Sequence, residues 1–208
     1  MPFNQEFLQI NQVGIHLFHF KDFNPFDYLD QLTSEEQERF FLFKHINRQR
    51  EFVATRILRH QLFGFEHIHY DENGAPFINK EGYISISHAP NVVGIAICKE
   101  FKVGLDLEII RSKSLLVKHK FLSLEETRKL DLTSMEEMTK VWSGKEALYK
   151  LAGRKEIHFK TELLLEKMSD TYWIGIIHNN SHSLKVEMCI FEHNGTIVSL
   201  NKMPCERI

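Results

Sequence analysis

The stretch Val103-Gly104-Leu105-Asp106-Leu107-Glu108-Ile109 predicts a short β-strand with two different faces. Side chains alternate across a strand, so the apolar residues fall on one face and can be buried. Asp106 and Glu108 lie together on the other face. The stretch has a counterpart at an offset of 90 residues, Val13-Gly-Ile-His-Leu-Phe18. That counterpart carries His16 and Phe18 where the acids stand, so a strand at this place does not require carboxylates.

Further matches follow in the same order along the two halves of the chain. The matched positions, all at an offset of 89 residues, are Ser34 with Ser123, Gly64 with Gly153, and Ile68–Tyr70 with Ile157–Phe159. Each match alone is at chance level, but a shared order at nearly one offset indicates an internal repeat. We therefore expect two related subdomains, residues 1–102 and 103–208, with a site at their interface, where ligand clefts preferentially occur.

Both halves predict the same order of elements. A strand is followed by a helix that opens with Ser34 or Ser123 and has glutamates in its first turn. A second helix then ends near Gly64 or Gly153, where a left-handed residue is favoured. The expected strands are 12–20, 83–88 and 92–99 in the first half, and 102–110, 162–167, 171–178, 184–191 and 195–200 in the second. The predicted fold class is α+β, a pseudo-dimer of two similar α/β subdomains.

Composition excludes several classes of protein. The 208 residues are 43% hydrophobic and 26% charged, which is ordinary for a globular protein. A net charge of −2 does not favour nucleic-acid binding, which needs a basic face. The sequence shows neither the order of a signal peptide nor a run of about 18 apolar residues. With three widely spaced cysteines, we expect a cytoplasmic protein with reduced thiols and no membrane partner.

The acids of the 103–109 strand admit two interpretations. Neighbouring carboxylates repel, so such a pair is solvent-exposed, has one raised pKa, or binds a cation. Farther along, Trp142, Glu146 and Lys150 share one face of a helix, with Lys145 beside them. A third carboxylate with ammonium groups suits a metal-bound anion. On pattern alone, a solvated polar strand face and a surface Glu146–Lys150 pair remain open.

Other polar residues are weaker candidates. Ser87 and His88 end the predicted strand 83–88 just before Pro90, which places the histidine at the mouth of a loop. Three arginines, Arg50, Arg56 and Arg59, lie along the first-half helix. Arg50 stands near the start of this helix, where a phosphate can bind. Exposed helix arginines and structural histidines are common, and the pattern does not choose among these residues.

Taken together, these segments resemble the 4'-phosphopantetheinyl transferases of the Sfp-like class. The family motifs G-(I/V)-D-x-E and (F/W)-(S/C/T)-x-K-E-(A/S)-x-x-K stand here as Gly104-Leu-Asp-Leu-Glu108 and Trp142-Ser-Gly-Lys-Glu-Ala-Leu-Tyr-Lys150. The two motifs together are far more specific than either alone. The resemblance runs in order from about Ser34 to Phe159, and it fits the two-copy plan, because this class is similar to a fused pseudo-dimer.

The resemblance implies a definite reaction and a set of residues for it. Coenzyme A would give its phosphopantetheine arm to a serine of an apo acyl or peptidyl carrier protein, releasing 3',5'-ADP. Asp106, Glu108 and Glu146 would hold the cofactor Mg2+, and Glu146 would also act as the base. Lys150 and Lys145 would neutralise the transferred phosphoryl group. The residues implied to contact coenzyme A are Arg50, Ser87, His88, Lys145 and Lys150. The enzyme would act as a monomer.

The chain departs from the family pattern at two positions. Ala75 stands where the family often has a lysine of a Gly-Lys-Pro sequence. Either the affinity for the 3'-phosphate is weaker here, or another base such as Lys80 substitutes for that lysine. Ala89 stands where the family often has the second serine of Ser-His-Ser. Neither change touches the implied metal residues, and activity is still expected.

Two other functions compete with the transferase. One is a non-catalytic relative that binds carrier protein or coenzyme A and regulates a synthase. The other is a magnesium-dependent nucleotide hydrolase. For carrier docking the sequence suggests the basic residues 111–120, with an ordinary solvated helix as the alternative. We expect the aromatic run Phe40–Phe43 to belong to the core.

Overall fold

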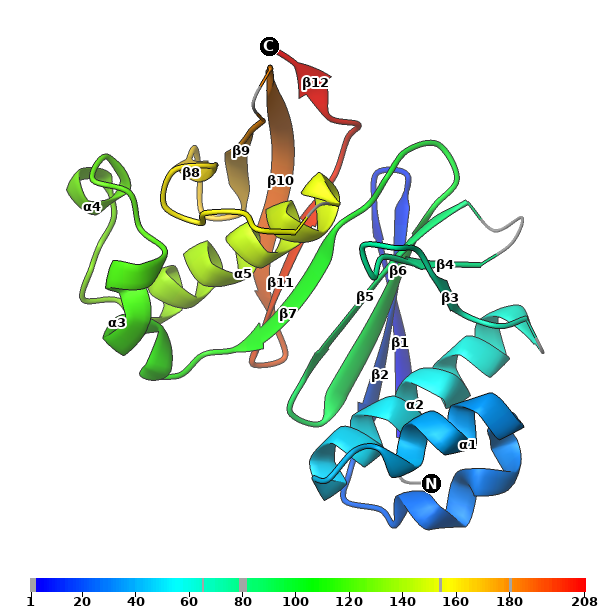
Figure 1. The fold of residues 1–208 in the computed structure, drawn as a ribbon. Helices are drawn as coiled ribbons and strands as arrows, with labels where there is room; N and C mark the ends of the chain where they lie inside the picture. Colours follow the sequence, from blue (N-terminus) through cyan, green and yellow to red (C-terminus); the bar gives the residue numbers. More distant parts are fainter. Residues whose placement is uncertain (1–2, 65, 79–81, 154, 180) are drawn as a thin grey trace.

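The protein has an α+β architecture with two antiparallel sheets. The structure is a computed structural model that describes residues 3–64, 66–78, 82–153, 155–179 and 181–208. Figure 1 shows the two sheets next to each other, with α2 (Ile46–Phe63) crossing the first and α5 (Met135–Ala152) crossing the second. None of the helices in these ranges is long and apolar enough to cross a bilayer.

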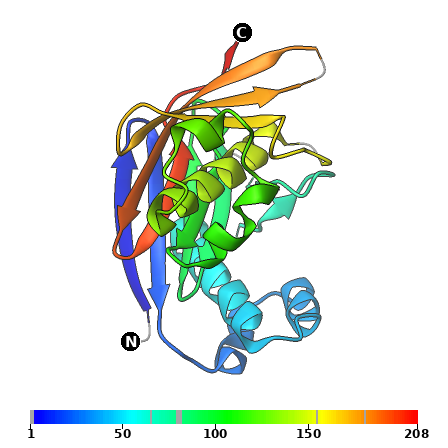
Figure 2. The same cartoon turned by 90° about the vertical axis from the view of Figure 1, so that its left-hand side faces the viewer.

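The first half builds a sheet with the strand order β1-β2-β6-β5-β4-β3. Its other elements, in chain order, are β1 (Phe3–Ile10), β2 (Val13–Phe20), the 3-10 helix η1 (Pro25–Gln31), α1 (Ser34–Phe41), β3 (His69–Tyr70), β4 (Pro76–Phe77), β5 (Tyr83–Ala89) and β6 (Val92–Cys98). Helix α2 packs on this sheet through buried residues such as Val53, Leu58 and Ile95. Figure 2 shows the β1–β2 hairpin on the side of the molecule away from α1.

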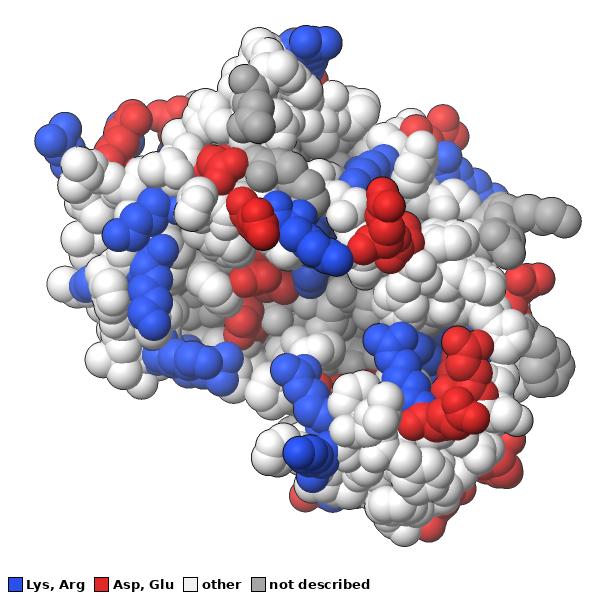
Figure 3. All heavy atoms as spheres, in the orientation of Figure 1, with Lys and Arg blue, Asp and Glu red and all other residues white. Residues whose placement is uncertain are grey.

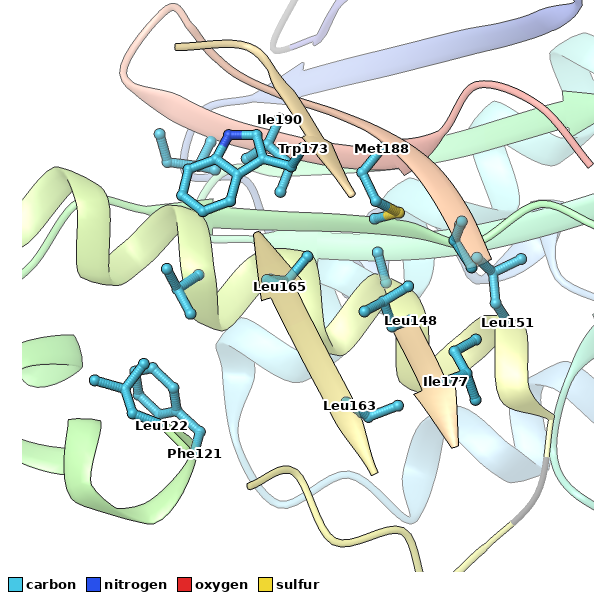
Figure 4. Packing of buried hydrophobic residues seen from close by; sticks show 14 of the residues in the cluster. Phe121, Leu122, Leu148, Leu151, Leu163, Leu165, Trp173, Ile177, Met188 and Ile190 are labelled. Carbon is cyan, nitrogen blue, oxygen red and sulfur yellow. The ribbon is translucent and has the colours of Figure 1, made fainter. Parts of the chain in front are cut away.

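The second half builds a sheet with the order β7-β11-β10-β9-β8, and β12 pairs with β10. Its other elements are β7 (Leu105–Ile109), α3 (Lys113–Val117), the 3-10 helix η2 (Lys118–Lys120), α4 (Glu126–Lys129), β8 (Leu163–Lys167), β9 (Tyr172–His178), β10 (Ser183–His193), β11 (Thr196–Asn201) and β12 (Glu206–Arg207). Figure 4 shows how Leu148 and Leu151 of α5 meet Leu163, Ile177 and Met188 of the strands.

The two sheets repeat one strand order. From β2 onward the first sheet runs β2-β6-β5-β4-β3, and the second runs β7-β11-β10-β9-β8. In the first half β2 pairs with β6, and in the second half β7 pairs with β11. In each half, helices and an antiparallel meander lie between the two paired strands in the chain. The expected boundary at residues 102 and 103 falls in the connection between β6 and β7.

A shared core joins the halves. Leu17 of β2, Ala96 of β6, Leu105 and Leu107 of β7, and Val198 of β11 belong to one buried cluster. The predicted alternation along β7 is confirmed, because its leucines are buried in this cluster while Asp106 and Glu108 face away from it. Strand β7 therefore has its position set by both sheets at once.

Several local expectations need correction. Thr33, rather than Ser34, caps α1, because its hydroxyl and the Glu36 carboxylate form a reciprocal capping box. Gly153 is left-handed as predicted, whereas Gly64 has a positive φ but a ψ of −129°.

The aromatic run also departs from expectation. Phe40 is fully buried and Phe43 half-buried, but Phe41 and Leu42 are exposed. Helix α1 ends at Phe41, so the chain turns away from the core at these two residues. Strand β1 was not predicted, since its Asn4-Gln5-Glu6 sequence is polar.

Gly104 provides a test of how closely β7 approaches α5. A Cβ at Gly104 would overlap the Ala147 carbonyl oxygen and lie 2.8 Å from Leu151 Cγ. We expect Gly104→Ala to lower the free energy of unfolding by about 1–3 kcal/mol, as overpacking does. Gly14, its counterpart in the repeat, would bring a Cβ only against the exposed Phe7 ring at 3.1 Å. Urea unfolding should therefore show a clearly smaller loss for Gly14→Ala; equal losses would contradict the close approach.

Candidate active site

Strand β7 and helix α5 bring the predicted acids together with Lys150. Asp106 is 6% exposed, and its Oδ1 accepts hydrogen bonds from Lys150 Nζ and from Ser87 Oγ, each at 3.0 Å. Lys150 Nζ also donates to the Leu105 carbonyl oxygen at 2.7 Å. The second oxygen, Asp106 Oδ2, is buried and has no hydrogen-bond partner among the described residues. One oxygen of this carboxylate is thus held by the protein, and the other remains available.

The other two carboxylates are electrostatically coupled to Asp106. Burial raises the pKa of Glu108, and the neighbouring Asp106 raises it further, while a hydrogen bond from Trp142 opposes the shift. That bond joins Trp142 Nε1 to Glu108 Oε1 at 2.9 Å. Burial also raises the pKa of Glu146, to about 7, with Asp106 adding to the shift and Lys150 opposing it. Burial and mutual repulsion therefore oppose full ionisation of the three acids.

The donor set fits a hard divalent cation. Mg2+ prefers carboxylate oxygens together with the phosphate oxygens of a substrate. The unpartnered Asp106 Oδ2 and the mutual destabilisation of the acids are what such an ion would relieve. As the side chains are placed, no three His, Cys, Asp or Glu side chains in the described ranges enclose an ion by themselves. The residues fit the group as partial ligands that a substrate would complete.

Two cavities lie along β7 and α5, one lined by Glu108 and Glu146 and the other by Lys150. The first, of about 560 Å3, includes Glu108, Trp142, Glu146 and Phe159 in its wall, with Lys120 among its basic residues. The rings of Trp142 and Phe159 stack at 5.5 Å.

The second cavity, of about 550 Å3, is lined by both halves of the chain, including Pro76, Tyr83, Lys102, Tyr149 and Lys150. In Figure 3, acidic atoms lie inside the hollow between the halves, and Lys and Arg atoms lie on both sides of it. The two cavities are of similar size, and Lys150 connects the second one to the acids through its bond to Asp106.

His88 lies close to this site and has an unexpected partner. Arg48 Nη1 lies 2.8 Å from His88 Nε2, and Glu51 lies 3.5 Å from the same ring. Burial lowers the pKa of His88, and Lys150 and Asp106 also act on it electrostatically. We did not single out Arg48 from the sequence. Its spacing of three residues from Glu51 on one helix would have predicted the Arg48–Glu51 ion pair.

Two residues predicted to contact coenzyme A, Arg50 and Lys145, instead bind other groups of the protein. Arg50 donates to Phe23 O and Asp22 Oδ1, each at 2.8 Å, and lines a separate small cavity of about 70 Å3. Lys145 is fully buried on the other side of α5, so the expectation that it adds charge to the cleft is not met.

The buried Lys145 ammonium is satisfied by protein groups. It donates to Glu126 Oε2 at 2.8 Å and to the carbonyl oxygens of Phe121 and Phe159 at 2.6 and 2.9 Å. Glu126 also accepts from the backbone of Ser123 and Leu165. Lys145 therefore ties the segments that build the wall of the first cavity.

The remaining candidates also have structural partners. Ser87 is 5% exposed, and its hydroxyl is used by Asp106 and by the backbone of β7. Arg56 and Arg59 are buried and share Glu36 as an ion-pair partner. Lys80 lies outside the described residues. No protein-family model and no curated protein sequence matches this chain.

The raised pKa of Glu146 predicts a pH dependence of stability. A folded-state pKa of about 7, above the ordinary 4.5, means that the native protein holds this proton more tightly than the unfolded chain. The free energy of unfolding should therefore fall as pH rises from about 4.5 to 7. Urea unfolding in chelator at several pH values should show this decline, and Glu146→Gln should lessen it. Parallel curves for the two proteins would contradict the assignment.

The buried Lys145–Glu126 pair predicts a structural role. Lys145→Met leaves Glu126 without its buried counter-ion, which typically costs about 3–5 kcal/mol of unfolding free energy. Lys129 pairs with Glu125 and Glu166 at an exposed site, so Lys129→Met should cause little change. Urea unfolding measures both. A Lys145→Met protein as stable as Lys129→Met would exclude this role.

Proposed function

We propose that this protein transfers the 4'-phosphopantetheine group from coenzyme A to a serine of an apo acyl or peptidyl carrier protein, using Mg2+ and releasing 3',5'-ADP. The observation that carries the proposal is the group of three coupled carboxylates with Lys150. Glu108 and Glu146 line the first cavity, and Lys150 lines the second cavity, whose wall comes from both halves. We further propose that it acts as a monomer in the cytoplasm.

The repeated strand order supports the fold that this function implies. Sheets running β2-β6-β5-β4-β3 and β7-β11-β10-β9-β8 are what a fused pseudo-dimer of residues 1–102 and 103–208 would produce. The second cavity is lined by both halves, as an active site at their interface requires.

The arrangement of the cavities matches the shape of coenzyme A. That substrate has a nucleotide at one end and a largely apolar arm at the other, joined by a pyrophosphate. The second cavity offers aromatic side chains and the ammonium groups of Lys102 and Lys150 to the nucleotide. The first offers Trp142 and Phe159 to the arm. The pyrophosphate would then lie beside the acids, and Lys102 would provide a cation on the side where Ala75 provides none.

Each site residue has a defined part in the reaction. Asp106, Glu108 and Glu146 would hold Mg2+, which supplies charge neutralisation to the pyrophosphate when bound. Lys150 has two hydrogen-bond acceptors among the described residues, which leaves the third donor of its ammonium group for the transferred phosphoryl group. His88, with Arg48, would contribute to the nucleotide end.

The chemical step forms one bond and breaks another. The carrier serine oxygen bonds to the phosphorus of the phosphopantetheine group, and the bond from that phosphorus to the bridging oxygen breaks. The 3',5'-ADP leaves with the bonding electrons. Glu146 would accept the serine proton. Such a reaction needs positioning and charge neutralisation more than covalent help.

The basic residues next to the first cavity suit an acidic carrier protein. Arg111, Lys113 and Lys120 line that cavity, and α3 presents Leu116 with 73% exposure. Charge complementarity of this kind mainly speeds and orients association. Docking here would bring the carrier serine to the acids.

Mass spectrometry of several apo carrier proteins, mixed with the protein, coenzyme A and Mg2+, tests the proposal. We expect a gain of one phosphopantetheine group on a carrier. Asp106→Asn should reduce the rate by at least about 100-fold, because one removed charge-stabilising group commonly costs that much. Asp170→Asn, at an exposed surface position, should transfer normally. Release of 3',5'-ADP without a carrier would indicate a hydrolase, and binding with no transfer to any carrier would indicate a regulator.

A further inference from the structure

Two serines of β5 make nearly the same contact with β7. Ser85 and Ser87 are both buried, with 3% and 5% exposure. The Leu105 amide donates to Ser85 Oγ at 2.9 Å, and the Leu107 amide donates to Ser87 Oγ at 3.1 Å. Of the two serines, Ser87 alone donates its hydroxyl to Asp106 Oδ1, at 3.0 Å, among the described contacts. Of these two described residues, Ser85 lines the second cavity and Ser87 does not.

The Ser87 hydroxyl has no proton left for a ligand. A serine hydroxyl carries one hydrogen, and here that hydrogen is directed to Asp106. Its oxygen already accepts from Leu107, and the side chain is almost fully buried. A direct contact with a phosphate of coenzyme A would require breaking the bond to Asp106.

We propose that Ser87 is a positioning residue for Asp106 rather than a coenzyme A contact, and that it thereby sets the affinity of the site for a divalent cation. Ser87 and Lys150 both bind Oδ1, which fixes the carboxylate and leaves the buried Oδ2 as the oxygen for the metal. The inference rests on the proposed function for the identity of the ion. Hydrogen-bond partners of metal ligands typically change affinity by about 10–100-fold when removed.

The matched pair Ser87→Ala and Ser85→Ala tests the inference. Each variant removes a buried hydroxyl and leaves one amide of β7 without its acceptor, so both should lose unfolding free energy in chelator. The loss should be larger for Ser87→Ala, which also removes the hydrogen bond to the Asp106 carboxylate. Titration with Mn2+ alone, followed by electron paramagnetic resonance, should show wild-type affinity for Ser85→Ala. Ser87→Ala should bind about 10–100-fold more weakly.

Kinetics provide a second measurement. In Ser87→Ala the concentration of Mg2+ needed for half-maximal transfer should rise, while kcat at saturating Mg2+ and the KM for coenzyme A stay near wild type. A raised KM for coenzyme A with unchanged Mn2+ affinity would overturn the inference in favour of a direct contact. Equal Mn2+ affinities for the two variants, or no Mn2+ binding by the wild type, would also overturn it. A wild type that binds Mn2+ but modifies no carrier would instead refute the proposed function.

Discussion

The whole arrangement depends on the seam where β7 meets β5. Strand β7 is the edge of its own sheet, paired only with β11 among the described strands, so its outer backbone groups need other partners. Two serine hydroxyls of β5 accept hydrogen bonds from backbone amides of β7, and Lys150 donates a hydrogen bond to one β7 carbonyl oxygen. Side-chain hydrogen bonds thereby connect the two sheets, although the described strands β5 and β7 do not pair backbone to backbone. Because the same serine holds Asp106, the contact that joins the halves also orients the principal acid.

The contacts between β5, β7 and α5 explain how three neighbouring carboxylates can be partly buried despite their mutual repulsion. A buried charge is costly unless it is paired and hydrogen-bonded. Asp106 meets this condition through Ser87 and Lys150, whereas Glu108 and Glu146 respond with raised pKa values. Strongly perturbed acids beside a cavity are typical of functional sites, although structural ion networks produce them as well. Here the unpartnered oxygen of Asp106 favours the functional interpretation.

Two of the three lysines of α5, Lys145 and Lys150, show how one helix serves both stability and chemistry. Lys150 reaches the acids, while Lys145 enters the core and is satisfied by Glu126 and two carbonyl oxygens. The rings of Phe121 and Phe159, whose backbones Lys145 holds, pack on Trp142, and Trp142 donates to Glu108. The structural lysine is therefore connected to the site through packing, even though it contributes no charge to the cleft.

The sequence by itself determined the α+β class, most of the longer strands and helices, and the faces of β7 and α5. These features follow from local periodicity, which places Asp106 with Glu108 and Glu146 with Lys150 whatever the rest of the chain does. Only the tertiary structure decided where Lys145 points, that Ser87 serves Asp106, and that Arg48 meets His88. These contacts join residues 19 to 40 positions apart in the chain. Periodicity constrains neighbours within one element, whereas such partners depend on how separate elements pack.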